Sequence, residues 1–280
     1  MATEWDFDSE DKMPLLTLKE CLEAGKKGVS ITNEHYHSLE GISGSSLSYL
    51  IESNKHYDNR HLFAPTLNCL EFGSLVHTLV LEPEEVFERY VSAPKFDLRT
   101  NIGKADFESF NSTNTKTIVS LDDFKIAEKM AINVKAIAGD IIEAGIKERS
   151  LFCDYDGLIL KCRLDIDIEE TGDDYDLKTI TLGTKEFNNQ TIERHIKKYG
   201  YHRAAALRNI VRRQLGKPVG KSYLIFVSTR NGNMVRVIEI DPDWITTAEY
   251  EVQDLLVERR FYLARKIDKP FTIIRNSFYE

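Results

Sequence analysis

The sequence predicts a mixed α/β (α+β) core that follows a helical N-terminal part. Three observations predict this class. Apolar residues recur at helical spacing up to about residue 144, strand-like alternation separated by turn signals follows, and long helical patterns are interleaved with the last strands. The 280 residues, 42% hydrophobic and 29% charged, are typical of a folded chain that can bury a sizeable core.

The first half of the chain is predicted to be helical apart from one polar loop. We expect residues 1–36 to form an N-terminal tail with one short helix around Leu16–Ala24, and residues 37–280 to form a single domain. Apolar spacing predicts helices at Ser45–Ser53, Leu70–Leu81 (ended by Glu82–Pro83) and Asp122–Ala144, and a loop with one short helix is expected over residues 94–120.

The second half is predicted to alternate strands and helices. Three antiparallel strands are expected at Ser150–Tyr155, Leu158–Ile168 and Tyr175–Thr181, with turns at Asp156-Gly157 and Glu169–Gly172. One basic helix over Gln190–Leu215, stopping at Gly216, comes next. A hairpin of Tyr223–Thr229 and Met234–Ile240 about Asn231-Gly232 and a helix from Trp244 to Lys266 complete the chain.

The composition predicts the cellular compartment of the protein. No apolar run approaches the roughly 20 residues of a membrane-spanning helix, and the acidic start MATEWDFDSEDK lacks the pattern of a signal peptide. Cys21, Cys69, Cys153 and Cys162 show no CxxC pair, which favours reduced thiols. We therefore expect a cytoplasmic protein with no membrane partner.

The charge distribution is uneven. A net charge of −8 argues against nucleic acid when it is taken as a total. Lys185–Lys221, however, contains ten Lys/Arg and two Glu, which gives +8 and leaves −16 for the rest of the chain. This asymmetry predicts a basic surface on an acidic body.

The hairpin Leu158–Thr181 carries the most informative side chains. If its loop is Glu169–Gly172, Asp165 lies directly opposite Asp176, with β-carbons about 5 Å apart, and Lys178 shares their face. Leu164, Ile166, Ile168 and Leu177 then form the opposite, core-facing side, whereas Asp167 joins Asp165 as a spare ligand or a solvated group.

Two facing carboxylates repel each other, and a divalent cation would resolve that conflict. Mg²⁺ takes carboxylate and carbonyl oxygens, and a neighbouring lysine can hold the attacking water or stabilise developing negative charge. A bare D-x-K more often marks an ordinary solvated face, and the same register sets Arg163 opposite Lys178. His77, four residues after Gly73 in an apolar helix, is more often a core histidine than a ligand unless that helix packs beside the hairpin.

The basic helix has the residue types of a phosphate-binding surface. Its candidate DNA contacts are Arg194, Lys198, Tyr201, His202, Arg208 and Arg212. Basic residues interleaved with aromatic ones suit contact with a phosphate backbone. A solvated helix face, or a face that pairs with the acidic remainder, is an equally good interpretation.

The order of these motifs resembles the RecE-type exonucleases (exodeoxyribonuclease VIII) of the PD-(D/E)XK nuclease superfamily. The similar segments are GSLVHTLVLEP (Gly73–Pro83), LKCRLDIDI (Leu160–Ile168), YDLKTI (Tyr175–Ile180) and YGYHRAAALRN (Tyr199–Asn209), supported by Ile42–Tyr57 and Arg99–Phe110. The resemblance covers roughly residues 30–265.

This resemblance implies a mixed central sheet flanked by helices and a metal site. His77, Asp165, Asp176 and the main-chain carbonyl of Leu177 would bind Mg²⁺, with Mn²⁺ as a possible substitute, and Lys178 would lie at the attacking water. It also implies resection of double-stranded DNA ends, a RecT-like single-strand annealing protein as partner, and a ring-shaped homo-oligomer.

One motif departs from that family. Ala204 and Arg208 stand at the Gln and Tyr positions of its Gln-x-x-x-Tyr motif, and Arg208 could supply a phosphate contact instead. No cysteine follows Cys162, so we expect no iron–sulphur cluster.

The hairpin geometry and the order of the motifs together predict a Mg²⁺-dependent DNA exonuclease, and the resemblance implies that it works 5′ to 3′ in recombination. Asp165, Asp176 and Lys178 are the expected catalytic residues. The alternatives are a catalytically weak or inactive DNA-binding scaffold of the same fold, an endonuclease of the superfamily, and a protein–protein module with no DNA role.

Overall fold

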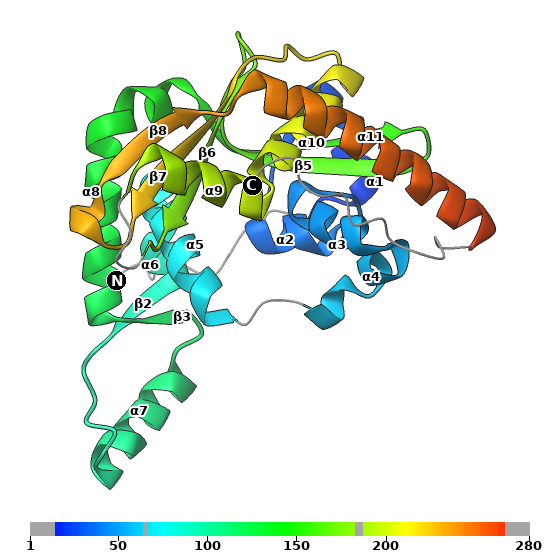
Figure 1. The fold of residues 1–280 in the computed structure, drawn as a ribbon. Helices are drawn as coiled ribbons and strands as arrows, with labels where there is room; N and C mark the ends of the chain where they lie inside the picture. Colours follow the sequence, from blue (N-terminus) through cyan, green and yellow to red (C-terminus); the bar gives the residue numbers. More distant parts are fainter. Residues whose placement is uncertain (1–14, 64–66, 183–186, 267–280) are drawn as a thin grey trace, which may run out of the picture.

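The computed structural model describes residues 15–63, 67–182 and 187–266, which build a six-stranded mixed sheet with helices on both faces (Figure 1). The strand order is β1-β4-β5-β6-β7-β8, and every neighbouring pair is antiparallel except β6 and β7. The strands are β1 (Val29–Ser30), β4 (Ile146–Tyr155), β5 (Leu158–Ile168), β6 (Asp173–Ile180), β7 (Ser222–Ser228) and β8 (Val235–Glu239). The predicted order of three antiparallel strands, a helical segment, two strands and a final helix is confirmed, except that the middle segment holds two helices.

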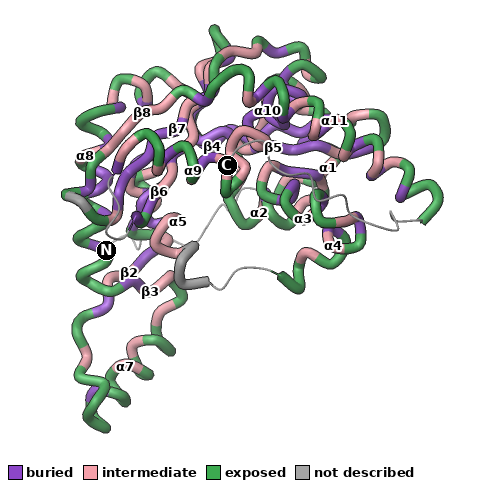
Figure 2. Tube along the Cα trace, viewed as in Figure 1, coloured by how far each residue is buried: buried purple, intermediate pink, exposed green. Residues whose placement is uncertain are grey.

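The helices divide between the two faces of this sheet. They are α1 (Leu18–Glu23), α2 (Asn33–Ser38), α3 (Leu47–Glu52), α4 (Asn54–Asp58), α5 (Leu67–Leu81), α6 (Val86–Arg89), α7 (Asn101–Thr113), α8 (Leu121–Ala144), α9 (Asn189–Tyr199), α10 (Tyr201–Gln214) and α11 (Pro242–Arg265). One buried cluster joins α3, α9, α10 and α11 to the sheet, and a second joins α5 and α8 to its other face (Figure 2).

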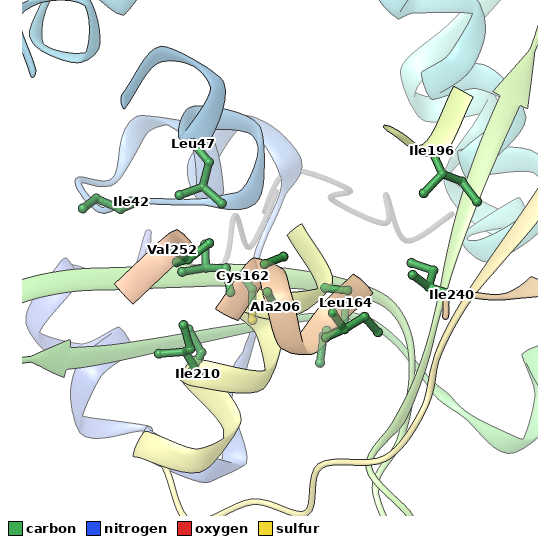
Figure 3. Close-up of a cluster of buried hydrophobic side chains, with 14 of the residues drawn as sticks. Ile42, Leu47, Cys162, Leu164, Ile196, Ala206, Ile210, Ile240 and Val252 are labelled. Carbon is green, nitrogen blue, oxygen red and sulfur yellow. The ribbon is translucent and has the colours of Figure 1, made fainter. Parts of the chain in front are cut away.

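The first core cluster forms where α10 lies between the sheet and α11. Figure 3 shows Cys162 and Leu164 of β5 against Ala206 and Ile210 of α10, with Val252 of α11 close by. These side chains are at most 4% exposed. Burial of this apolar area contributes roughly 25 cal/mol of stabilising free energy per Å². It is the main contribution that holds α10 on the sheet.

The N-terminal segment packs on the same sheet. Val29 of β1 pairs with Ser150 of β4, and Cys21 and Tyr36 bury themselves against Phe152. Lys161 of β5 donates a hydrogen bond to the carbonyl of Tyr36 at 2.7 Å. The part of the expected tail before residue 15 lies outside the described residues.

Two predicted elements need correction. The basic segment forms two helices, because Gly200 adopts φ 67° and ψ 31°, a left-handed conformation that ends α9 and starts α10 in a new direction. Strands flank and enter the stretch 94–120, which was predicted to be a loop: β2 (Tyr90–Ala93), just before it, pairs in parallel with β3 (Thr117–Ser120), at its end, and α7 projects from the body between them (Figure 1). Four-residue strands are too short for periodicity to reveal.

The side chains of β5 do not keep one alternation along the strand. Leu164 belongs to the core beneath α10, whereas Ile166 and Leu177 belong to the core beneath α5 and α8. The prediction that these three share one face is therefore wrong. Glu148, on the neighbouring strand at this point, has φ 52°, so the sheet is distorted at the point where the alternation changes.

A buried ion network fixes the end of the hairpin to α10. Asp167, which is fully buried, accepts hydrogen bonds from Arg212 of α10 and, at 3.1 Å, from Arg149 of β4. Lys217 lies 4.0 Å from the same carboxylate. Asp167 is therefore neither a spare metal ligand nor solvated, because its oxygens are committed to three cations of the scaffold.

We expect Asp167→Ala to lower the free energy of unfolding by about 3–5 kcal/mol, because it leaves buried cations without their counter-ion. Urea unfolding of the two proteins measures the difference. The matched control is Asp140→Ala, since Asp140 is exposed on α8 and its loss should change stability by less than about 0.5 kcal/mol. Equal stability of the two variants would contradict the structural role of the network.

Candidate metal centre and nucleic-acid surface

The central feature of the site is an interruption in the β5–β6 ladder. Ile166 pairs with Tyr175 and Asp167 with Asp174, the register predicted from the sequence. One step further, Asp165 faces Asp176, but no ladder pair forms there; instead the Asp165 carboxylate accepts the backbone N–H of Leu177 at 2.7 Å. From Asp174 to Ile180, β6 pairs with β7. Asp165 thus lies in the opening between β5 and β6.

Asp176 and Lys178 form the second part of the site on β6. The Lys178 Nζ lies 2.8 Å from the Asp176 Oδ2, and both side chains are largely shielded from solvent. The predicted grouping of Asp165, Asp176 and Lys178 is therefore observed. Arg163, predicted to lie opposite Lys178, instead binds the Glu148 carboxylate and the carbonyl of Ile31.

Burial and charge set the protonation states in this opening. Burial, reinforced by the Asp176 and Glu148 carboxylates and opposed by His77 and Lys178, raises the pKa of Asp165 to about 7. Burial opposes ionisation of Asp176 as well, but Lys178 and Arg208 overcome it and lower the pKa of Asp176. Burial would also lower the pKa of Lys178, yet Asp176 and Asp165 raise it above its usual value, so Lys178 is a cation.

His77 reaches the same opening from α5. Its Nε2 lies 2.7 Å from the carbonyl oxygen of Leu177, and its Nδ1 lies 3.7 Å from the Asp165 Oδ2. A Cβ on Gly73 would meet Thr179 of β6 at 3.6 Å, an ordinary contact, which shows how closely α5 packs on the strand. The condition for a ligand role of His77, that its helix lies beside the hairpin, is met.

Sequence reasoning missed one residue of the site, Glu148. The pairs Lys147–Ile166 and Arg149–Leu164 set Glu148 opposite Asp165, and ligand atoms of His77, Glu148 and Asp165 lie within 4.8 Å of one another. Glu148 escapes prediction because it precedes the strand expected at Ser150–Tyr155. Extending that strand from the Asp156-Gly157 turn in strict register is the signal that would reveal it.

The donor set suits a divalent cation. Carboxylate and carbonyl oxygens are the ligands that Mg²⁺, Ca²⁺ and Mn²⁺ prefer, and one imidazole nitrogen is compatible with Mn²⁺. The Leu177 carbonyl accepts a hydrogen bond from His77 and retains a second lone pair. Four side chains and one carbonyl therefore converge on a partly shielded opening where like charges need a cation.

Next to Lys178 lies a small aromatic surface that continues onto α9. The Tyr201 ring centroid is 5.6 Å from the Lys178 Nζ, and Tyr199, which is 55% exposed, stacks on Tyr201 with centroids 6.0 Å apart. Arg194 and Lys198 are exposed on α9, and the Lys198 Nζ lies 5.2 Å from the Tyr199 ring. This aromatic–cationic surface borders the carboxylates.

Three of the predicted DNA contacts point elsewhere. Arg208 is 5% exposed with its Nε 2.7 Å from Asp174, and Arg212 is fully buried against Asp167, so neither guanidinium reaches a phosphate. His202 turns toward Trp244, and its Nδ1 is shielded from solvent. The prediction that Arg208 supplies a phosphate contact is wrong, since the face of α10 that carries it packs on the sheet.

Ala204, at the Gln position of the motif, has a packing role. A Cβ added to Gly44 would lie 2.8 Å from the Ala204 Cβ, so the turn before α3 lies directly on α10. A larger side chain at residue 204 would have to displace that turn. The departures at Ala204 and Arg208 therefore serve the packing of α10.

The charge asymmetry also has a structural explanation. Lys185 lies outside the described residues; of the nine other basic residues in Lys185–Lys221, all but Arg194 and Lys198 form ion pairs with acids of the described chain. These seven are Lys197, Arg203, Arg208, Arg212, Arg213, Lys217 and Lys221. The predicted basic surface is therefore largely neutralised, and the two basic residues of the segment without an ion pair among the described residues, Arg194 and Lys198, both lie on α9.

Comparison with known proteins assigns the chain to a family. Residues 43–262 match the family described as "PDDEXK-like domain of unknown function (DUF3799)". The chain belongs to this family. No curated protein matches the chain. Because the matched range contains every residue of the site, the PDDEXK-like domain includes the whole β4–β7 sheet and the helices that carry His77 and Tyr201.

A solved structure supports the fold of the PDDEXK-like domain. A protein from Eubacterium rectale named "Putative exonuclease" superposes with a TM-score of 0.56 at 15% identity, over 84% of this chain and 88% of that one. The protein SSO0001 aligns over 66% of this chain and 85% of that one at 14% identity with a TM-score of 0.24, too low to support an argument. The fold is thus that of PD-(D/E)XK nucleases.

Among the described helices, none combines the length and apolarity needed to span a membrane.

The burial of His202 predicts a pH dependence of stability. Burial, with Arg203 nearby, lowers the pKa of His202 to about 4, because a protonated ring would place a charge and a partnerless Nδ1–H in the interior. Its contribution to stability is fully present above about pH 6.5 and is lost as the pH falls toward 4. We expect His202→Gln to flatten the fall of the unfolding midpoint between pH 7 and 4.5.

The control for this experiment is His61→Gln, because His61 is exposed on the surface. It should leave the pH profile of the unfolding midpoint as in the unaltered protein. A profile for His202→Gln as steep as that of the control would show that His202 is not the group responsible.

Proposed function

We propose that this protein is a Mg²⁺-dependent DNA exonuclease that resects linear double-stranded DNA, in the 5′ to 3′ direction, during recombination. The observation that carries the proposal is the convergence of Asp165, Asp176, Lys178 and His77 at one opening of the sheet. The fold of the family supports hydrolysis of phosphodiester bonds, since metal-assisted displacement at phosphorus uses this combination of carboxylates and a cation.

Each residue has a role that follows from its position. His77, Asp165, Asp176 and the Leu177 carbonyl would hold the metal ion, which when bound polarises the phosphate and lowers the pKa of a coordinated water. Lys178, kept cationic by Asp176 and Asp165, is suited to hold the attacking water and to stabilise negative charge on the phosphate.

The DNA would approach over the aromatic–cationic surface of Tyr201, Tyr199, Arg194 and Lys198. A tyrosine face stacks on any base, and exposed cations bind phosphates without reading sequence. The short distance from Tyr201 to Lys178 would bring a base stacked there next to the scissile bond. End dependence, a RecT-like annealing partner and a ring-shaped homo-oligomer belong to this proposal through the resemblance to RecE-type exonucleases.

The first test is digestion of DNA. We expect the protein to degrade end-labelled linear duplex in Mg²⁺ or Mn²⁺, to spare covalently closed circles, and to be inactive in EDTA. Asp176→Asn and Lys178→Met should each lower the rate by about a hundredfold or more, because each removes charge stabilisation at the reacting phosphate.

Asp140→Asn, a substitution on the exposed surface of α8, is the matched control and should retain the full rate. Digestion by Asp176→Asn at the rate of the control would refute the proposed chemistry. DNA binding without any release of nucleotides by the unaltered protein would favour the inactive scaffold, and nicking of closed circles would favour an endonuclease.

The second test concerns DNA binding. We expect Arg194→Glu with Lys198→Glu to weaken binding to duplex ends and to reduce the slope of log affinity against log salt by roughly one for each phosphate that is no longer neutralised. Lys129→Glu with Lys135→Glu on α8 changes net charge equally and should leave that slope unchanged. Fluorescence anisotropy in Ca²⁺ over several salt concentrations gives both quantities. Equal effects of the two double variants would indicate that α9 is not the DNA surface.

A further inference from the structure

Three acidic side chains lie in a row across three adjacent strands. The pairs that flank Glu148 in the β4–β5 ladder set it opposite Asp165, and the register of the β5–β6 hairpin sets Asp165 opposite Asp176. Asp165 is therefore the middle member of a row Glu148–Asp165–Asp176. Like charges in directly opposed positions destabilise a sheet, so the row needs a compensating cation on both sides of Asp165.

On the Asp176 side, compensation comes from Lys178 within the chain. On the Glu148 side, the described residues supply Arg163, whose Nε donates to Glu148 Oε2. Arg163 is held in turn by the carbonyl of Ile31, next to β1. The ion pair with Arg163 uses the Oε2 of Glu148 and fixes the direction of the Glu148 side chain. The Oε1 of Glu148 is then available to bind a cation.

His77 is oriented toward the same side. Its Nε2 is engaged with the Leu177 carbonyl, so the ring nitrogen that remains is Nδ1, which faces Asp165. A ligand histidine characteristically donates its other ring N–H to a backbone carbonyl, which fixes the tautomer. Two donors of one Mg²⁺ or Mn²⁺ ion lie about 3–4 Å apart, so the atoms of His77, Glu148 and Asp165, all within 4.8 Å, need only small rotations to share an ion.

We propose that Glu148 is a metal ligand of this site, binding the cation together with His77 Nδ1 and Asp165, and that Arg163 positions it. This inference rests on the proposed function, because it concerns the same metal site, and it adds a carboxylate from β4 that none of the sequence motifs contains. The metal would then be bound from three elements, α5, β4 and β5, with Asp165 shared between the Glu148 and Asp176 sides of the row.

The test measures Mn²⁺ binding to the full chain without DNA, by the loss of the free-ion signal in electron paramagnetic resonance. Glu148→Gln should weaken binding by about tenfold or more, since even partners outside the ligand shell contribute that much. Glu148→Asp keeps the charge but has a side chain one carbon shorter, so its Mn²⁺ affinity should lie between those of the unaltered protein and Glu148→Gln. Asp165→Asn should abolish binding, whereas Glu143→Gln, on the exposed end of α8, should not change it.

The outcomes separate this inference from the proposed function. Unchanged affinity in Glu148→Gln, with weakened binding in Asp165→Asn, would overturn the role of Glu148 and leave the nuclease proposal intact. No Mn²⁺ binding by the unaltered protein would overturn both. If Glu148→Gln does not unfold cooperatively, Glu148→Asp decides, and unaltered affinity there overturns the inference. Arg163→Lys keeps the Glu148 carboxylate and a cation beside it, so it should lower the affinity less than Glu148→Gln does. An equal loss in the two variants would assign the effect to the ion pair and overturn the ligand role of Glu148.

Discussion

The hydrogen bond from the Leu177 N–H to the Asp165 carboxylate is the interaction on which the site depends. A side chain replaces a backbone carbonyl as acceptor, so the buried N–H of Leu177 stays satisfied where the β5–β6 ladder ends. Along its other edge β6 stays paired in parallel with β7, while the Asp165 carboxylate lies in the opening beside β5. One contact thereby creates the gap in the sheet and orients an acidic group within it.

Keeping several buried carboxylates in one place requires a rigid surrounding. The Asp167 network ties β4, β5 and α10 together just beyond the opening, and Arg208 with Asp174 adds a second tie between α10 and β6. Breaking buried pairs is costly, so these ties resist relaxation of the strands away from the like charges. Arg208 and Arg212 of α10 thus hold the strands of the site in place through buried ion pairs.

The hairpin register and the grouping of the candidate site residues on β5 and β6 were predictable because they follow from local rules. A four-residue turn at Glu169–Gly172 determines that Asp165 faces Asp176, and strand alternation adds Lys178. The break between α9 and α10 was not predicted, because the segment Gln190–Leu215 was interpreted as one helix; in the structure the break falls at Gly200. Arg208 and Arg212 could not be assigned from sequence, because a basic helix has the same pattern whether its cations face water or buried aspartates.

The sequence by itself determined the order of the strands β4 to β8, the hairpin register and the family motifs, since each depends on neighbouring residues and side-chain periodicity. Only the tertiary structure decided that His77 reaches the hairpin 100 residues away, that Glu148 completes a row of carboxylates, and that most cations of the basic segment are paired. Those facts depend on how helices pack on a distorted sheet. Packing brings together residues whose separation along the chain gives no indication that they are in contact.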